Sequence, residues 1–501
     1  MTVRAEHDSL KDYLESVLTT EQLARPLLTN FNHWIFAQDA LAEVALTLSN
    51  RGSNVTIGFW ADKTPMLDVA WGTSRMIGAL LFSPTREAQI EKALKKAGLA
   101  KSNFVKPPIH RWKPSEPIDI PQVLNRTNIR AMTYRGAAVG RAILQIHPDR
   151  DTPMTDKHLW PRAWVTAAAQ SFAYVFDQTH AVIAQREITM LAVYNGRFLH
   201  DRAAAVAAES LGIPVVSYDL GGHDTDFDLT LDDTHDWDAL QNRMLTMYVN
   251  WDPKERDILG SKWFLDRTQH LDRMNSRFVE SQTIGSMVDL PRDKKIVVYF
   301  SSSGDEIVEL DLDWGSYFGG QEKALKLVAQ ICAEDPDTYF IVRSHPHKRH
   351  KPKHDVQEWI AAVDSANPDL HLDPHSEVDS YELMRAADLV ITYGSTSGVE
   401  AAFAKKPVIV MGPSAYNILG CATQVVNQDE LKQAMAESKA GQWSGAVSYG
   451  LMMKRRGFNR EHTHQFTQVK DTGSLVKNLS MLKRNRAFAK YLETTNQKGN
   501  A

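Results

Sequence analysis

The stretch Ala387–Asn417, ADLVITYGSTSGVEAAFAKKPVIVMGPSAYN, decides the fold class of this 501-residue chain. It opens with a short apolar run, Leu389–Thr392, that is typical of a buried parallel strand. The small-residue turn Gly394–Gly398 follows, then an alanine-rich helix, and then a second apolar strand at Val408–Met411. Strand, turn, helix and strand in this order predict a βαβ unit. Its turn falls at the carboxyl end of a strand, which is where open α/β sheets bind ligands.

The chemistry of this turn suits a phosphate. Ser395, Thr396 and Ser397 place three hydroxyls beside the predicted start of the helix, where exposed N–H groups favour an anion. Glu400 lies one helical turn further and is placed to accept hydrogen bonds from a ribose. A simpler interpretation is a tight turn with a Ser or Thr N-cap. The turn alone leaves both interpretations open.

Composition limits the class of protein. Hydrophobic residues make up 43% and charged residues 24% of the chain, which is typical of soluble globular proteins, and the length predicts two or three domains. The 57 Lys and Arg against 61 Asp and Glu give a formal net charge of −4, so no overall field attracts nucleic acid or a bilayer. The two cysteines, Cys332 and Cys421, predict no disulfide framework and favour a reducing compartment.

The sequence also predicts a cytoplasmic protein. The N-terminal residues are charged throughout and lack the apolar core of a signal peptide. No apolar run approaches the ~18 residues that a membrane-spanning helix needs.

The first half of the chain repeats the strand–turn–helix pattern. Pro26–Thr29 and Val55–Phe59 flank one predicted helix, and Met190–Tyr194 and Ile213–Tyr218 flank another. We therefore expect a second parallel sheet, with polar residues where its strands end. Candidates for a general base at these ends are Asp219, His223 and Asp224, and His33 or Asp39. The acidic run that continues to Asp238 is typical of a solvated loop.

Two further strands are predicted in the second half, Ile296–Phe300 and Tyr339–Val342. Because strand ends of a parallel sheet emerge on one side, their turns should meet the turn at Gly394. Hydroxyls, a cation and imidazoles would then surround one nucleotide phosphate, and His345 or Arg343 would neutralise charge on the phosphate oxygen as its bond breaks. The expected nucleotide-binding residues are Ser302, Ser303, Arg343, His345, Ser395, Thr396, Ser397 and Glu400.

Competing motifs are weaker. No GxGxxG follows a strand, and no GxxxxGK[ST] occurs, so neither a dinucleotide fold nor a P-loop is predicted. The histidines of the run His345–His354 lie among Lys and Arg, which disfavours a metal site. Asp311-Leu312-Asp313 matches the DxD of some glycosyltransferases, but it lacks their sequence context. We expect no metal and no cofactor.

These elements predict an α/β fold with two Rossmann-like domains that face each other across a cleft. The expected divisions are an acceptor domain at 1–290, a nucleotide-binding domain at 291–450 and a basic helical segment at 451–501. Ten Lys and Arg lie within Lys454–Lys490. This segment either holds an anionic membrane surface or packs back on the protein with its charges solvated.

The second half of the chain resembles the nucleotide-binding half of GT-B glycosyltransferases, and most closely capsule and cell-surface polysaccharide biosynthesis proteins. The phrase from Ala387 to Gly412 carries this resemblance. Arg343–His347 (RSHPH) resembles the His-Pro motif of bacterial sialyl-, Kdo- and glycerophosphotransferases, which use cytidine-nucleotide donors. Tyr194–Gly222 (YNGRFLHDRAAAVAAESLGIPVVSYDLGG) looks like the N-terminal half of capsule synthesis proteins, although Asp219-Leu220-Gly221 stands where they usually have Glu-x-Gly.

The resemblance implies sugar transfer from a nucleotide-activated donor, CMP/CDP- or UDP-linked, to a surface-polysaccharide or lipid-linked acceptor. In this interpretation His345 and the hydroxyls of Ser395–Ser397 hold the donor phosphate. Glu400 has no second glutamate seven residues further on, which favours inversion. Two alternatives remain: a sugar-nucleotide 2-epimerase of the same fold, and a non-catalytic nucleotide-binding scaffold.

Overall fold

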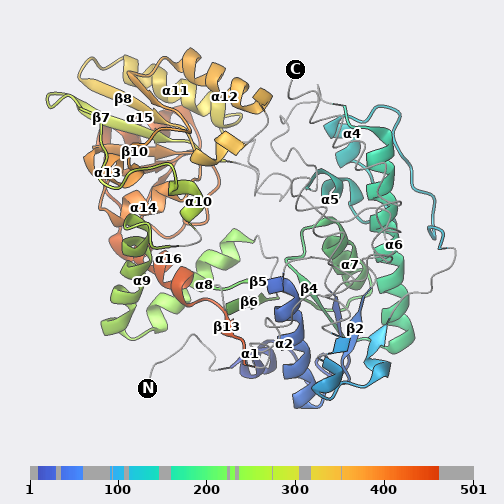
Figure 1. The fold of residues 1–501 in the computed structure, drawn as a ribbon. Helices are drawn as coiled ribbons and strands as arrows, with labels where there is room; N and C mark the ends of the chain where they lie inside the picture. The colour runs from blue at the N-terminus through green and yellow to red at the C-terminus, as the bar shows by residue number, and fades with distance from the viewer. Residues whose placement is uncertain are drawn as a thin grey trace. The chain divides into compact units, whose positions relative to one another are not determined.

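The computed structural model describes residues 9–29, 35–59, 91–92, 94–105, 112–145, 159–222, 226–231, 236–272, 275–303, 317–350 and 353–461. The chain divides into two compact units (Figure 1). We call them the N-terminal unit, which contains Glu6–Thr234 and Gly457–Ala501, and the C-terminal unit, which contains His235–Arg456. Each is described by itself.

A parallel sheet with an antiparallel edge forms the centre of the N-terminal unit. In the described residues its strand order is β13-β6-β5-β4-β1-β2-β3. The strands from β5 to β3 are parallel to one another, whereas β6 is antiparallel to both of its neighbours, β5 and β13. Their bounds are β1 Pro26–Thr29, β2 Thr56–Gly58, β3 Phe104–Val105, β4 Met190–Tyr194, β5 Val215–Leu220, β6 Asp226–Thr230 and β13 Phe458–Asn459.

Helices cover both faces of this sheet. Leu191 and Val193 of β4 pack toward α5, α6 and α7, while Met190 and Ala192 pack toward α1 and α2. Alternate residues of the strand thus enter two different cores, as the two-residue period of a strand requires. The helices are α1 Leu10–Val17, α2 Ile35–Arg51, α4 Arg126–Arg130, α5 Val139–Gln145, α6 Arg162–Arg186 and α7 Leu199–Glu209, with a 3-10 helix at Lys101–Asn103.

The described sheet of the C-terminal unit is parallel throughout, in the order β12-β11-β10-β7-β8-β9. Val297 and Tyr299 of β7 face one core, and Ile296 and Val298 face the other. A strand buried on both faces needs an apolar residue at every position, which explains the unbroken run IVVYF. The strands are β7 Lys295–Phe300, β8 Thr338–Arg343, β9 Leu370–Leu372, β10 Leu389–Thr392, β11 Val408–Val410 and β12 Thr423–Gln424.

One face of this second sheet packs against α11, α12 and α15, and the other against α8, α9, α13, α14 and α16 (Figure 1). Gly260 of α9 lies against α16, where an added Cβ would meet the Val447 carbonyl oxygen at 2.4 Å. The helices are α8 Trp237–Asn250, α9 Pro253–Thr268, α10 Ser276–Val279, α11 Gln321–Ala333, α12 Lys353–Ala366, α13 Ser380–Ala386, α14 Ser397–Phe403, α15 Gln428–Glu437 and α16 Trp443–Arg455, with a 3-10 helix at Pro346–His350.

Two parallel-sheet units of this kind confirm the predicted α/β fold class. Two local predictions differ from the structure. The strand expected at Ile213–Tyr218 continues to Leu220, because its last residues pair with β6. Part of the acidic run expected to be a solvated loop is β6 itself, in which Asp226 and Asp228 are each only 9% exposed.

The boundary between the two units is not at residue 290, where the sequence predicted it. It falls between Thr234 and His235, because α8 and α9 pack against α16 within the C-terminal core. After α16 the chain returns to the N-terminal unit, where Phe458 of β13 pairs with Phe227. The part of the basic segment 451–501 that follows Glu461 lies outside the described residues.

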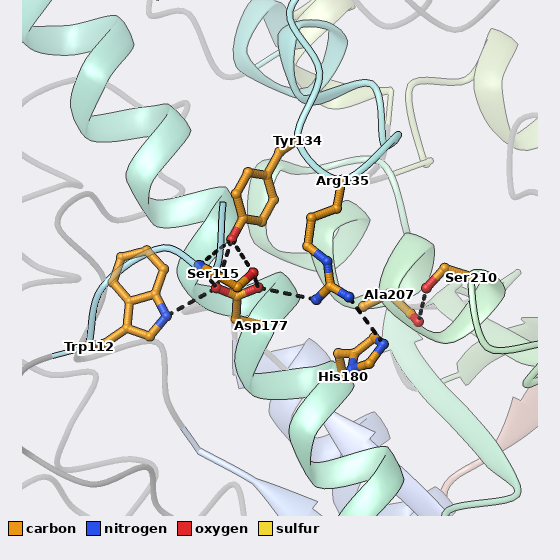
Figure 2. A network of polar contacts seen from close by, with 8 residues as sticks. All are labelled: Trp112, Ser115, Tyr134, Arg135, Asp177, His180, Ala207 and Ser210. Carbon is orange, nitrogen blue, oxygen red and sulfur yellow. Dashed lines mark hydrogen bonds and ion pairs between the residues drawn. The ribbon is translucent and has the colours of Figure 1, made fainter. Parts of the chain in front are cut away.

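A polar network on α6 holds the stretch that contains Trp112 and Ser115 in place (Figure 2). The carboxylate of Asp177 accepts from the hydroxyls of Tyr134 (2.7 Å) and Ser115 (2.8 Å), and from the Trp112 indole (3.3 Å). Arg135 lies 3.5 Å from the same carboxylate and stacks on Phe176. The stretch that contains Trp112 and Ser115 is therefore tied to one partly buried acid of α6.

Asp177→Asn should lower the free energy of unfolding of the N-terminal unit by about 1–3 kcal/mol, because hydrogen bonds to a charged group are lost and one donor is left without an acceptor. Urea denaturation measures the change. Asp119→Asn is the matched control, since Asp119 is exposed in the same stretch. This variant should change the free energy of unfolding by no more than about 0.5 kcal/mol. Equal midpoints for the two variants would contradict this role of Asp177.

Candidate donor-binding site

Three strand ends of the C-terminal unit meet at one edge of the sheet. β7 lies between β10 and β8, and the register aligns Phe300 with both Thr392 and Arg343. The turns that follow are therefore level with one another. Hydrogen bonds join two of them directly: Ser301 N–H donates to the Arg343 carbonyl (3.1 Å), and His345 N–H donates to Ser301 Oγ (2.8 Å). The sheet therefore brings the three turns together, as the sequence predicted.

The serine turn after β10 is held in a fixed conformation. Gly394 has a φ of +95°, which a residue with a side chain rarely adopts. Ser395 N–H donates to Thr392 Oγ1 (3.0 Å), and Ser395 Oγ lies 3.2 Å from Ser397 Oγ. Ser395 is buried, Ser397 is half-buried and Thr396 is exposed. Two linked hydroxyls and a third at the surface are thus presented at this edge.

His345 has a defined ring orientation. Its Nδ1 accepts a hydrogen bond from the backbone N–H of His347 (3.2 Å), so the proton of the neutral ring is on Nε2. The ring of Phe278, in α10, packs edge-on against the imidazole at 5.4 Å. Pro346 begins the 3-10 helix that supplies the His347 N–H. The imidazole of His345 therefore carries its proton on Nε2, in a half-buried side chain.

Ser302 and Ser303 continue β7 at the same edge. The side chain of Gln321 accepts from Ser302 N–H (2.5 Å) and donates to the Ser302 carbonyl (3.3 Å). Ser302 Oγ is buried and has no hydrogen-bond partner among the described residues. A buried hydroxyl without a partner is costly, and a ligand oxygen would satisfy it. Ser303 is half-buried and is the last described residue of this turn.

Arg343 does not have the predicted role of binding a phosphate, because its side chain is buried. It is 1% exposed, and its guanidinium donates to the carbonyls of Asp373 (3.1 Å) and Ser376 (3.3 Å). Burial lowers the pKa of Arg343 to about 10. These contacts give Arg343 a structural function: it ties the loop after β9 to β8.

Glu400 also makes its contacts inside the protein. Its carboxylate accepts from Arg267 Nε at 2.5 Å, and the Tyr381 hydroxyl lies 3.4 Å from the same oxygen. Arg267 also contacts Asp272 and Asn275, each at 3.0 Å. Burial opposes the charge of Arg267, but Glu400 outweighs it and raises the Arg267 pKa above its usual value. Glu400 therefore stands in a buried ion pair, with side-chain exposures of 11% and 7%, where a ribose contact was predicted.

In the N-terminal unit Asp219 lies within β5 and is held by neighbours. One carboxylate oxygen accepts from Leu220 N–H (2.7 Å) and the other from the Asn195 amide. The Tyr194 hydroxyl also hydrogen-bonds Asp219, and burial together with this carboxylate raises the Tyr194 pKa well above its usual value. Asp39 pairs with Arg460 at 2.9 Å.

The remaining predicted bases cannot be placed. His33, His223 and Asp224 lie outside the described residues, as does Asp311-Leu312-Asp313. Within the described part of the chain, no group of three or more His, Cys, Asp or Glu is arranged to hold a metal ion. No described helix is long and apolar enough to cross a membrane.

Residues 267–451 match the model of a family described as capsule polysaccharide biosynthesis protein. This segment contains all three turns of the candidate site. The predicted resemblance to capsule polysaccharide biosynthesis proteins is therefore confirmed for this part of the chain, and the match supports a role in capsule synthesis.

Solved structures similar to this chain include two of Thermosulfurimonas dismutans KpsC. Its beta Kdo 2,4 transferase is 16% identical, with 53% of this chain and 87% of that chain covered and a TM-score of 0.32. Its beta Kdo 2,7 transferase is 18% identical, with 55% and 80% covered and a TM-score of 0.31. A UDP-GlcNAc 2-epimerase of Methanocaldococcus jannaschii is 12% identical, with 56% and 79% covered and a TM-score of 0.28. No curated protein matches the chain.

Sequence reasoning missed four residues that shape the site: Gln241, Arg267, Phe278 and Tyr416. Gln241, Arg267 and Phe278 contact parts of the site that are distant in sequence, and Tyr416, within Ala387–Asn417, contacts Ser395 of the same stretch. The family match begins at Arg267, but a buried Arg cannot be told from a surface Arg by its sequence neighbours. Helix α9 has Trp263 and Phe264 directed into the core, which is the one sequence signal that its inner face is important.

Arg267→Met should destabilise the C-terminal unit by about 3–5 kcal/mol, because it leaves Glu400 buried without its partner. Adding Glu400→Leu should recover much of this loss, since no uncompensated charge then remains. The free energy of unfolding in urea measures both. Arg385→Met is the control: its pair with Glu382 is exposed (47% and 35%), so less than about 1 kcal/mol should be lost. A double variant no more stable than Arg267→Met would contradict the ion-pair argument.

His371 should make the stability of the C-terminal unit depend on pH. Trp359 Nε1–H donates to Ser344 Oγ (2.7 Å), which leaves the Ser344 hydroxyl to donate to His371 Nε2 (2.8 Å). Burial lowers the pKa of His371 below its usual 6.5. The unfolded chain therefore binds this proton at a higher pH than the folded chain does, and the free energy of unfolding falls as the pH drops below about 6.5.

His371→Gln keeps a hydrogen-bond acceptor for Ser344 but does not titrate. Urea midpoints measured at about pH 7.5 and about pH 5 should therefore differ less in this variant than in the wild type. His375→Gln, at an exposed position in the same unit, should keep the wild-type difference. The same pH dependence in His371→Gln and wild type would disprove the assignment.

Proposed function

We propose that this protein is a glycosyltransferase that transfers a sugar from a nucleotide-activated donor to a surface-polysaccharide or glycolipid acceptor. The donor phosphate binds at the edge formed by the turns after β7, β8 and β10. The observation that carries the proposal is the alignment of His345 and the serine turn on either side of β7, within a segment that matches capsule polysaccharide biosynthesis proteins. Two strand spacings separate them by about 10 Å, a distance that a nucleotide phosphate and its sugar can span.

The chemistry follows from the donors at this edge. As the bond between the anomeric carbon and the phosphate oxygen breaks, the electron pair stays on that oxygen. His345 Nε2–H and the hydroxyls of Ser395, Ser397 and Ser302 donate hydrogen bonds to the growing negative charge. Donors that are already fixed in place stabilise such charge at little reorganisation cost. Ser395 and His345 are held by backbone contacts before any ligand arrives.

The acceptor hydroxyl must lose a proton to a base, which we assign to the carboxyl edge of the N-terminal sheet. Asp219, His223 and Asp224 remain the candidates. Asp219 already accepts hydrogen bonds from Leu220 and Asn195, which lowers its availability as a base. We therefore favour His223 or Asp224. We further propose a cytidine nucleotide as the donor, on the likeness of RSHPH to cytidine-nucleotide-dependent transferases.

A thermal-shift panel of CMP, CDP, UDP and GDP tests the donor site. A bound nucleotide raises stability by RT ln(1 + [L]/Kd), which is about 2.7 kcal/mol at 100 times Kd. We expect CMP or CDP to raise the Tm of the wild type. His345→Ala combined with Ser395→Ala should remove most of this shift, whereas His375→Ala combined with Ser365→Ala, at exposed positions, should not. A response to UDP alone would refute the cytidine preference.

Product analysis separates the candidate activities. A transferase releases free nucleotide and lengthens the acceptor, whereas a 2-epimerase returns an isomerised sugar and a scaffold returns the donor unchanged. The His345→Ala, Ser395→Ala double variant should lose transfer altogether. Full cellular function in that variant would disprove a catalytic role for this edge.

A further inference from the structure

The loop after β11 supports the serine turn from the side opposite to His345. β11 is the neighbour of β10, and Val410 aligns with Thr392, so this loop begins at the same edge of the sheet. Its Tyr416 is 1% exposed, and its hydroxyl donates to the Ser395 carbonyl at 2.5 Å. Gly398 N–H donates to the same carbonyl at 3.0 Å. The backbone of the turn thus has one anchor of its own and one from the loop.

The space around the Tyr416 hydroxyl is closed. A Cβ added to Gly398 would lie 2.2 Å from that oxygen, so only glycine fits beside it. The Tyr416 ring packs edge-on against Tyr449 of α16, with ring centres 6.3 Å apart. The hydroxyl therefore has one position available, and the Ser395 carbonyl lies within its reach.

Gln241 of α8 fixes the loop directly after Tyr416. Its side-chain N–H groups donate to Asn417 Oδ1 (2.8 Å) and to the Trp237 carbonyl (3.0 Å), and its oxygen accepts from Ile418 N–H (2.9 Å). Gln241 is fully buried. A buried amide with all these groups satisfied is rigid, so the two residues that follow Tyr416 are held by a helix 170 or more positions earlier in the chain.

We propose that Tyr416, held in place by Gln241, is a positioning residue of the donor site. The Tyr416 hydroxyl fixes the Ser395 carbonyl, and the turn in turn directs the hydroxyls of Ser395 and Ser397. The claim that this turn binds a donor nucleotide rests on the proposed function. The claim that Tyr416 fixes the turn rests on the contacts alone, so the two are tested by different measurements.

Tyr416→Phe removes one hydroxyl and keeps the ring. One hydrogen bond is worth roughly 0.5–1.5 kcal/mol, so amide hydrogen exchange in a peptide spanning residues 394–404 should become about threefold to tenfold faster without nucleotide. Tyr248→Phe is the matched control, since it removes the hydroxyl that bonds Asp257 at 2.7 Å in the same unit. Unchanged exchange in the 394–404 peptide of Tyr416→Phe would overturn the proposal.

Nucleotide affinity provides the functional readout. For the nucleotide of the CMP, CDP, UDP and GDP panel that stabilises the wild type, Tyr416→Phe should weaken Kd by about threefold to tenfold, and Tyr248→Phe should leave it unchanged. Combining Tyr416→Phe with Ser395→Ala should cost less than the product of the two single effects, because both changes act on one turn. A lower Tm with an unchanged Kd would show that Tyr416 stabilises the fold only, and would overturn the proposal.

Asn417→Ala tests the Gln241 contact by a second route. It removes one contact of Gln241 at a half-buried position, so it should fold and should accelerate exchange in the 394–404 peptide to a smaller extent than Tyr416→Phe. If the wild type binds none of the four nucleotides, the proposed function fails. The exchange measurements then still decide whether Tyr416 fixes the turn.

Discussion

The buried ion pair between Arg267 and Glu400 connects the parts of the candidate donor site. Arg267 lies on α9, and Glu400 lies on α14, one turn after Ser397. The other guanidinium nitrogens of Arg267 contact Asp272 and Asn275, which lead into α10. α10 carries Phe278, whose ring packs on His345. One buried cation is thus connected to the serine turn on one side and to the His-Pro turn on the other.

Such a pair is stable only when its remaining hydrogen-bonding groups are satisfied, because both charges lose their hydration. Here the three contacts of Arg267 use all of its nitrogens, its guanidinium lies over the Trp263 ring at 4.4 Å, and Tyr381 bonds both Asn275 and Glu400. The result is a closed polar cluster in an otherwise apolar layer. Its specific geometry requires α9, α13 and α14 to pack in one arrangement, and that arrangement also sets where Ser395 and Ser397 lie.

The need of a buried charge for hydrogen-bond partners separates the predicted site residues into two groups. His345, Ser302, Ser395 and Ser397 present groups at the edge of the sheet. Arg343 and Glu400, which are equally close in sequence to the motifs, are directed inward, where they tie loops and helices together. A charged residue in a motif is therefore as able to support a turn as to bind the ligand, and only the position of its partners decides between these roles.

Much of this protein could be predicted from the sequence because strand ends of a parallel sheet are ordered by local patterns. The apolar runs at Ile296–Phe300 and Leu389–Thr392, each followed by small polar residues, determined the α/β class and the edge at which the turns of the candidate site meet. The burial of Arg343, the pairing of Glu400 with Arg267, the continuation of β5 through Asp219 and the support of Ser395 by Tyr416 were decided only by the tertiary structure. Each depends on a partner in another element, from the neighbouring strand β6 to Arg267, which is 133 positions from Glu400. Local periodicity carries no information about which side chain will satisfy a buried charge or carbonyl.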